Sequence, residues 1–435
     1  MAHNMDNDQQ EVNYQEIDHD NFDDFLCNYH EGDLLRGIYA YGFERPSPIQ
    51  AKAIQPICDG RDLVAQAQSG SGKTGAFIMG ALTKIDMSIR RPQVIVIANT
   101  RELAAQIETV AKNIGKFIKS DNGGKHGSVE LKVSLCVGGS IKDTNSNLKE
   151  ASVSQILIGT PGRLVDLIER DTNRKYGKND LLDDLKILVL DEADKLLGED
   201  FRDQIHKVLK RIPIKCQVCL FSATYLQDIL DLTKKFLNNP VRILVDKEKI
   251  SVDSIKNYYV DAQYEENKYD ILVDLYQKVS VCQAVIFVNS IRKAIEVSDS
   301  LIKDGHSVGT IHSKLNDLER RDILTNFRRT QTRILVATDI ISRGIDIQQV
   351  GLVINYDVPT DPEQYIHRVG RSGRYGKLGV AITFLTSHHS DSMRMRNIER
   401  NYRIKFESLP PLETVNHYLT GLKGYNYIDT SSQVN

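Results

Sequence analysis

Short, continuously apolar runs alternate with helix-compatible segments along most of the chain, and this alternation limits the fold more than any other feature. Runs rich in β-branched residues occur at 62–66, 93–99, 132–138, 155–160, 186–191 and 217–223, and a second series follows at 283–290, 307–313, 332–339, 352–359 and 379–386. Runs that stay apolar are typical of parallel strands covered on both faces. The sequence therefore predicts an α/β protein of two tandem units, each a mostly parallel sheet with helices on both faces.

The chain is long enough for two such units. At 435 residues it exceeds the size at which one hydrophobic core usually stops growing. The apolar pattern lapses into charged residues and proline between 238 and 256, so we place the boundary there. We predict a first domain over 21–240, a linker over 241–254 and a second domain over 255–420.

Both ends of the chain differ in composition from its middle. Ten acidic residues, and no lysine or arginine, precede Arg36. Segments that are polar, charged and poor in apolar residues cannot bury enough surface to fold. We therefore predict a disordered acidic tail over 1–20 and a loose tail over 421–435.

The composition excludes several classes of protein. With 41% hydrophobic and 26% charged residues, the chain has the make-up of a soluble globular protein, and no apolar run approaches the roughly 18 residues of a membrane span. Its beginning lacks the basic and then apolar layout of a secretory signal. The six cysteines are scattered, as expected in a reducing compartment. We expect a cytoplasmic protein without membrane contact, with the nucleus as the alternative location.

Two of the cysteines, Cys216 and Cys219, form a CxxC pair within a strand-like stretch. Residues three apart in a strand point to opposite faces of the sheet. No second pair accompanies them. This pattern favours two core cysteines over a zinc or redox site.

The segment 64–77, VAQAQSGSGKTGAF, is the strongest local signal. A strand ending near Gln66 is followed by small residues and then by a helix-compatible run, so backbone N–H groups can turn toward an anion. Lys73 can reach the β- and γ-phosphates of a nucleotide, and the Thr74 hydroxyl can hold Mg²⁺. The alternative is a Gly/Ser-rich loop with a chance lysine. The predicted phosphate-loop residues are Ala67, Gln68, Ser69, Gly70, Ser71, Gly72, Lys73 and Thr74.

Three carboxylates follow the apolar run 187–190 within four positions. Open α/β sheets hold ligands at the carboxyl ends of their strands, so Asp191 can meet a Mg²⁺ beside the phosphate loop. Glu192 can take a proton from an attacking water, and Asp194 can anchor a neighbouring polar loop. The alternative is a helix N-terminus that is enriched in acids because of the helix dipole.

A basic cluster lies in 365–376, YIHRVGRSGRYG. Arg368, Arg371 and Arg374 recur every third residue, which predicts that they lie near one face of a helix. The two intervening glycines would each weaken an ordinary helix by about 1 kcal/mol, which suggests that something approaches the backbone closely. Guanidinium groups fit phosphate oxygens, so these arginines can reach the nucleotide from the second domain. The alternative is a solvated basic face.

Together these motifs resemble the DEAD-box family of ATP-dependent RNA helicases. AxSGSGKT (67–74), DEAD (191–194), SAT (222–224) and HRVGRSGR (367–374) occur in the order and spacing of that family, and the resemblance spans about 22–420. It implies two tandem RecA-like domains, with ATP and Mg²⁺ as cofactors. Within the family, the chain most resembles the subfamily of eukaryotic translation initiation factor four-A.

The resemblance also implies roles at the nucleotide. Gln50 would pair with the adenine edge, and an upstream aromatic residue would stack on the base. The spacing of this aromatic residue in the family, 17 residues before the glycine of 42–50, favours Phe25, whereas the local sequence FDDF (22–25) favours Phe22. Asp346 would hold the ribose. The implied catalytic residues are Lys73, Asp191, Glu192 and, as arginine fingers, Arg371 and Arg374; the residues implied to couple the ATP site to RNA are Asp194, Ser222, Thr224 and His367.

The family's RNA path would run along loops of both domains. Contacts from backbone N–H groups, hydroxyls and arginines bind phosphates and carry little sequence information, and 2′-hydroxyls distinguish RNA from DNA. We therefore expect sequence-independent binding of mainly single-stranded RNA, weakened by salt. The implied residues are Thr100, Arg101, Gly139, Thr160, Pro161, Gly162 and Arg163 in the first domain, and Arg292, Thr338 and Asp339 in the second.

The leading functional hypothesis is an RNA-stimulated ATPase in translation initiation or related RNA metabolism. It would separate short duplexes as ATP and RNA close the two domains. An ATP-locked RNA clamp that serves as a platform for other proteins is the alternative, and a DNA-directed or metabolic ATPase is a third hypothesis. We expect a monomer whose partners are RNA and protein regulators of domain closure.

Overall fold

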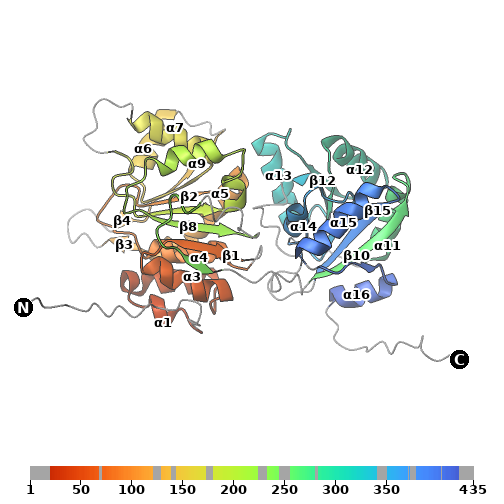
Figure 1. The fold of residues 1–435 in the computed structure, drawn as a ribbon, viewed down its shortest axis with the longest axis horizontal. Helices are drawn as coiled ribbons and strands as arrows, with labels where there is room; N and C mark the ends of the chain where they lie inside the picture. Colours follow the sequence, from red (N-terminus) through yellow and green to blue (C-terminus); the bar gives the residue numbers. More distant parts are fainter. Residues whose placement is uncertain are drawn as a thin grey trace, which may run out of the picture. The chain divides into compact units, whose positions relative to one another are not determined.

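The structure is a computed structural model of the chain. It describes residues 20–67, 71–120, 129–138, 144–172, 180–223, 233–243, 255–279, 283–339, 350–370, 372, 379–402 and 404–420. The chain divides into two compact units, Met1–Asp246 and Lys247–Asn435. Figure 1 shows that each unit has a central sheet with helices packed beside it.

Unit 1, Met1–Asp246, has in its described part a parallel seven-stranded sheet of order β5-β6-β2-β7-β8-β1-β9. Because neighbouring strands run parallel, their carboxyl ends lie along one edge of this sheet. A short antiparallel pair, β3 and β4, lies outside it. The strands are β1 (Leu63–Gln66), β2 (Val94–Ile97), β3 (Lys119–Ser120), β4 (Val129–Glu130), β5 (Val133–Cys136), β6 (Ile156–Gly159), β7 (Ile187–Asp191), β8 (Gln217–Ser222) and β9 (Val241–Ile243).

Two helices of unit 1, α3 and α5, begin at side chains that cap them. Ser47 and Gln50 form a capping box at the start of α3, and the Thr100 hydroxyl accepts the backbone N–H of Leu103 at the start of α5. The α-helices are α1 (Asp23–Leu26), α2 (Asp33–Tyr41), α3 (Pro48–Cys58), α4 (Lys73–Leu82), α5 (Arg101–Ile114), α6 (Thr144–Ser152), α7 (Pro161–Thr172), α8 (Ala193–Leu196) and α9 (Arg202–Leu209); the 3₁₀ turns are η1 (Tyr29–Gly32) and η2 (Gly115–Phe117).

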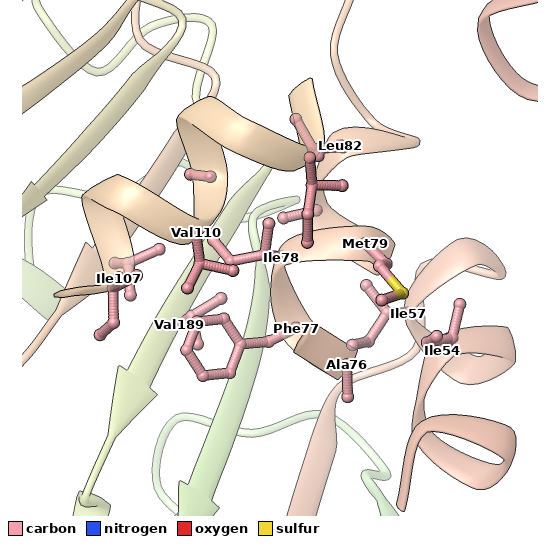
Figure 2. Packing of buried hydrophobic residues seen from close by; sticks show 14 of the residues in the cluster. Ile54, Ile57, Ala76, Phe77, Ile78, Met79, Leu82, Ile107, Val110 and Val189 are labelled. Atoms are coloured by element: carbon pink, nitrogen blue, oxygen red, sulfur yellow. The ribbon is translucent and has the colours of Figure 1, made fainter. Parts of the chain in front are cut away.

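Successive residues in most strands of the first sheet belong to two hydrophobic layers on opposite faces. Cys219 belongs to the layer under α2 to α5, whereas Cys216 belongs to the layer under α6, α7 and α9. Figure 2 shows the first of these layers, with Phe77 of α4 next to Val189 of β7. The expectation that the two cysteines are core residues on opposite faces is therefore confirmed.

Unit 2, Lys247–Asn435, repeats the pattern with the sheet order β12-β13-β11-β14-β15-β10-β16 in its described part, all parallel. Helices α11, α12 and α16 pack on one hydrophobic layer, and α13, α14 and α15 pack on the other side of the sheet. The strands are β10 (Ile255–Gln263), β11 (Ala284–Phe287), β12 (Val308–Ile311), β13 (Ile334–Ala337), β14 (Leu352–Asn355), β15 (Gly379–Thr386) and β16 (Glu407–Ser408), and the helices are α11 (Asn267–Lys278), α12 (Ile291–Lys303), α13 (Asp317–Arg328), α14 (Pro362–Val369), α15 (His389–Tyr402) and α16 (Leu412–Thr420).

These two sheets confirm the predicted fold class, and every apolar run named above contains a strand. Strand β10 has no such run, because only three of its nine residues are buried. Residues 241–243 form β9, which pairs with β1, so the predicted linker 241–254 starts within the first sheet; 244–254 lie outside the described residues. The other predicted domain boundaries stay predictions. No helix in the described ranges is both long and apolar enough to cross a bilayer.

Candidate functional site

The predicted phosphate loop joins the carboxyl end of β1 to the first turn of α4. Gln68, Ser69 and Gly70 lie outside the described residues. Gly72 precedes α4 with a φ of 99°, a left-handed conformation that favours glycine. A Cβ at this position would lie 2.8 Å from Nε2 of Gln50. The backbone conformation therefore favours glycine here, and a larger residue would also displace the Gln50 amide.

Polar atoms gather around this loop. Lys73 is only 7% exposed, and its ammonium donates a hydrogen bond to the carbonyl of Ala67 at 2.7 Å. The Ser71 hydroxyl and both amide atoms of Gln66 are buried, without a hydrogen-bond partner among the described residues. Because buried polar atoms are nearly always paired, these groups fit contact with a polar ligand such as a phosphate chain.

Gln50, the residue implied to read adenine, is fixed beside the phosphate loop. It is buried, and its Oε1 accepts the backbone N–H of Ser47 at 2.9 Å. Its Nε2 donates to the carbonyl of Gly72 at 3.2 Å. The capping of α3 therefore sets the orientation of this amide and joins it to the end of the phosphate loop.

The two candidate adenine-stacking residues lie side by side, with ring centroids 6.2 Å apart. Phe22 is fully buried and also packs against Tyr39 and Phe43, at centroid distances of 6.4 Å and 6.3 Å. Phe25 is half-buried. Of the two rings, only that of Phe25 keeps surface that a base can contact, whereas Phe22 is part of the core.

Asp191 and Glu192 lie at the carboxyl end of β7. Burial, and then the charge of Glu192, raise the pKa of Asp191 to about 7, although the nearby positive charge of Lys73 acts to lower it. Glu192 adopts a φ of 55°, and its buried Oε2 has no hydrogen-bond partner in the described part of the chain. Carboxylate and hydroxyl oxygens are the ligands that Mg²⁺ prefers, so Asp191, together with Thr74 in the first turn of α4, fits that ion.

Asp194 and Ser222, two of the implied coupling residues, are in direct contact. The Ser222 hydroxyl donates a hydrogen bond to Oδ1 of Asp194 at 2.8 Å. This bond ties the acidic segment after β7 to the carboxyl end of β8. Thr224 lies outside the described residues.

The RNA-binding residues implied for unit 1 follow β2 and β6 at the same edge of the sheet. Thr100 caps α5, and Arg101 begins that helix with an exposed side chain. Thr160 connects β6 to α7, and Pro161 and Gly162 are the first two residues of that helix. The Arg163 guanidinium, also in its first turn, forms an ion pair with Asp166. Gly139 lies outside the described residues.

The RNA-binding residues implied for unit 2 differ in exposure. Arg292 is 89% exposed in its side chain and pairs with Glu296 at 2.7 Å. Thr338 and Asp339 directly follow β13. Both carboxylate oxygens of Asp339 accept hydrogen bonds from the Arg368 guanidinium, at 2.6 Å and 2.9 Å. Asp339 is therefore held by an internal partner.

Arg368 is an internal residue, contrary to the sequence prediction for the basic cluster. Helix α14 ends at Val369 with Gly370 as its cap, so the described helix does not carry all three arginines on one face, and that prediction is wrong. His367, one residue earlier, is also buried. Arg371, Arg374 and Asp346 lie outside the described residues.

Asp357, which follows β14, connects Arg368 to a second set of charges. Its carboxylate accepts hydrogen bonds from Lys268 at 3.2 Å, from Lys293 at 2.9 Å and from the backbone N–H of Asn289 at 2.9 Å. Its carbonyl accepts one from Arg368 at 2.8 Å. Burial acts to raise the pKa of Asp357, but these donors outweigh it and lower the pKa below the usual value.

Comparison with known proteins agrees with this geometry. The family model for DEAD/DEAH box helicases matches residues 47–232, and that for the helicase conserved C-terminal domain matches 267–376. An ATP-dependent RNA helicase eIF4A of Candida glabrata is 44% identical over 407 residues, which cover 93% of this chain and 96% of that protein. The chain belongs to the DEAD-box helicase family. It is thus an ATP-dependent RNA helicase.

Other relatives of this DEAD-box protein include eukaryotic initiation factor 4A-3 of Arabidopsis thaliana. That protein is 43% identical over 399 residues, which cover 92% of this chain and 90% of the relative. Among solved structures, Saccharomyces cerevisiae Dbp5 bound to RNA and ADP BeF3 matches with a TM-score of 0.82 and 32% identity, over 93% of this chain and 99% of that one.

The sequence analysis did not predict the roles of two residues of this DEAD-box protein, Arg368 and Gln66. Arg368 belongs to the same basic segment as Arg371 and Arg374, and a charged residue in such a segment is expected to be exposed, whereas it is fully buried. Gln66 does carry a signal, since it is a polar residue at the end of an apolar strand that enters the phosphate loop. Its buried amide has no hydrogen-bond partner among the described residues, which makes it a further candidate for nucleotide contact.

Proposed function

We propose that this helicase is an RNA-stimulated ATPase that binds mainly single-stranded RNA without sequence preference and separates short duplexes locally. The observation that carries the proposal is the pair of buried carboxylates, Asp191 and Glu192, at the end of β7 close to the Lys73 ammonium. A buried acidic pair beside a phosphate-binding lysine suits transfer of a phosphoryl group to water.

Each of these residues has a distinct chemical task. Lys73 holds the β- and γ-phosphates, and Oε2 of Glu192, which no described residue contacts by a hydrogen bond, accepts a proton from the attacking water. Mg²⁺, held by Asp191 and Thr74, would neutralise negative charge on the phosphates. The bond between Asp194 and Ser222 keeps the acidic segment aligned with the end of β8.

Domain closure supplies the mechanical output in this proposal. Lys73 and Asp191 belong to unit 1, whereas Arg371 and Arg374, the proposed arginine fingers, belong to unit 2. Hydrolysis would then require that ATP and RNA bring the two units together, and product release would reopen them. The RNA path would be built from loop ends of both units, where guanidinium and hydroxyl groups bind phosphates rather than bases.

Protein regulators of closure are part of the proposal. Dbp5 of Saccharomyces cerevisiae, 32% identical to this chain, has been solved bound to Nup159 and Gle1. The eIF4A relatives support a role in translation initiation or related RNA metabolism, in the cytoplasm. We propose that the chain acts as a monomer that such partners switch on or off.

Two measurements test the proposal. ATP turnover should rise several-fold with single-stranded RNA and stay unchanged with DNA of the same sequence; stimulation by DNA alone would contradict the assignment. In a single-turnover assay, ATP should displace one strand of a short RNA duplex. Stable RNA retention without strand displacement would instead identify an ATP-locked clamp.

A further inference from the structure

The turn between α13 and β13 carries a cationic surface that the proposed ATP and RNA sites do not use. We call residues 328–333 the arginine turn, because Arg328, Arg329 and Arg333 all lie in it with exposed side chains. No acidic residue occurs between Asp322 and Asp339 in the sequence. Among the described residues, none of the three guanidinium groups has an ion-pair partner.

Several exposed cations elsewhere in unit 2 do have such partners. Lys278 pairs with Asp274 at 2.5 Å, and Arg292 pairs with Glu296 at 2.7 Å, each at helical i,i+4 spacing. The dipole of α13 favours a cation in its last turn by about 0.3–1 kcal/mol, which accounts for Arg328 alone. Three exposed like charges with no ion-pair partner in the described part of the chain therefore form a local positive field that attracts an anion from outside.

Hydrogen bonds from two side chains outside the arginine turn fix the conformation of its backbone. The buried amide of Gln283 donates hydrogen bonds to the carbonyls of Phe327 and Thr332. The Ser307 hydroxyl donates to the carbonyl of Gln331 at 2.8 Å. Because the backbone is already ordered, a ligand that binds here loses little conformational entropy of the turn.

The arginine turn lies at the opposite end of β13 from the proposed RNA path. Arg333 precedes β13, whereas Thr338 and Asp339 follow it. At about 3.3 Å per residue, the strand separates Arg333 from Thr338 by roughly 16 Å. Ligands of open α/β sheets bind at the carboxyl ends of the strands, so a site at the amino end is distinct from the proposed one.

We propose that the arginine turn binds phosphates of an RNA segment that flanks the strand held in the central path. Guanidinium groups make charge-assisted, bidentate hydrogen bonds to phosphate oxygens, and three of them in one turn match a polyanion better than a single anion. The inference rests on the proposed RNA binding, because RNA is the polyanion that this helicase meets in every cycle.

The test compares three variants of the full-length chain. The first, Arg328→Gln with Arg329→Gln and Arg333→Gln, removes the three charges. The second replaces the same arginines by lysine and keeps the charge. The matched control, Lys278→Gln with Arg396→Gln and Arg400→Gln, removes three exposed cations from α11 and α15 of the same unit. Thermal unfolding verifies that all of them fold like the parent.

The readout is the salt dependence of binding to two single-stranded RNAs. One probe has about 10 nucleotides, within the roughly 4–16 that a single-stranded site covers, and the other has about 30. Each phosphate contact adds about 0.7 to the slope of log K against log salt. The glutamine variant should therefore lose about 2 from the slope for the long RNA and nothing for the short one, while the lysine variant and the matched control keep the parent's slopes.

Three results would overturn the inference. Equal slopes for the glutamine variant and the control on the long RNA would mean that the turn contacts no RNA, including the case in which it binds an acidic protein. An equal loss on both RNAs would mean that the turn belongs to the central path. If the parent binds neither RNA, the proposed RNA binding fails together with the inference. In the first two results the parent still binds RNA, so only the inference about the arginine turn fails.

Discussion

Replacing Arg368 by methionine is the perturbation of unit 2 whose cost is best defined by the structure. The guanidinium is fully buried and donates to both oxygens of Asp339, to Oδ1 of Asn289 and to the carbonyl of Asp357. Breaking a buried ion pair by removing one partner costs about 3–5 kcal/mol. The Asp339 side chain is 29% exposed and keeps some hydration, so we expect the lower end, about 3 kcal/mol.

The assay is chemical denaturation of the full-length protein, followed through the transition of unit 2. The matched control is Arg394→Met, because Arg394 pairs with Asp391 at 4.0 Å on a partly exposed surface, where such a pair contributes about 0–1 kcal/mol. Adding Asp339→Leu to Arg368→Met should recover part of the loss, since no buried charge is then left unpaired. A loss no larger than that of the control, or no recovery in the double variant, would refute the reasoning.

Three further predictions concern single side chains. Phe22→Ala should lower the free energy of unfolding by about 3–5 kcal/mol. Phe25→Ala should lower it less, because this ring is only partly buried against the same core, and should raise the KM for ATP roughly twofold to thirteenfold through loss of a stack of about 0.5–1.5 kcal/mol. Gly72→Ala should weaken ATP binding in a titration with a fluorescent nucleotide, because the left-handed backbone is strained by about 1–2 kcal/mol and the new Cβ displaces the Gln50 amide. The pKa of Asp357 is lower in the folded protein than the value of about 4 that it has in the unfolded chain. The ionised carboxylate therefore stabilises the fold above about pH 4, and this contribution is lost as the pH falls through the pKa of the folded protein. The free energy of unfolding of Asp357→Asn should consequently depend less on pH below about 4 than that of the parent.

The sheets and the phosphate loop were predictable because their signals are local. A run such as 186–191 is apolar on both faces and ends in acids, and this pattern reports a buried parallel strand with its carboxyl end at a ligand site. The phosphate loop is likewise recognisable from neighbouring residues, because Gly72 and Lys73 directly precede and begin α4. Strand β10 was missed because near the edge of its sheet only some of its residues are buried, and its pairing with β15 depends on residues more than 100 positions away.

The role of Arg368 could not be read from the sequence, because it arises from long-range contacts. Its partners Asn289, Asp339 and Asp357 follow three different strands, β11, β13 and β14, which only the folded sheet brings together. The spacing of three residues between arginines suggested a shared helix face, but the glycine after Val369 ends the helix first. Periodicity predicts a face only where the helix continues.

The most direct test of the proposed chemistry is RNA-stimulated ATP turnover in Glu192→Gln, with Glu199→Gln, an exposed acid in the same segment, as the matched control. If Glu192 accepts the proton of the attacking water, its variant should bind ATP like the parent but turn it over roughly 10²-fold more slowly, while the control keeps the parent's rate. Turnover in Glu192→Gln equal to that of the parent would contradict the account.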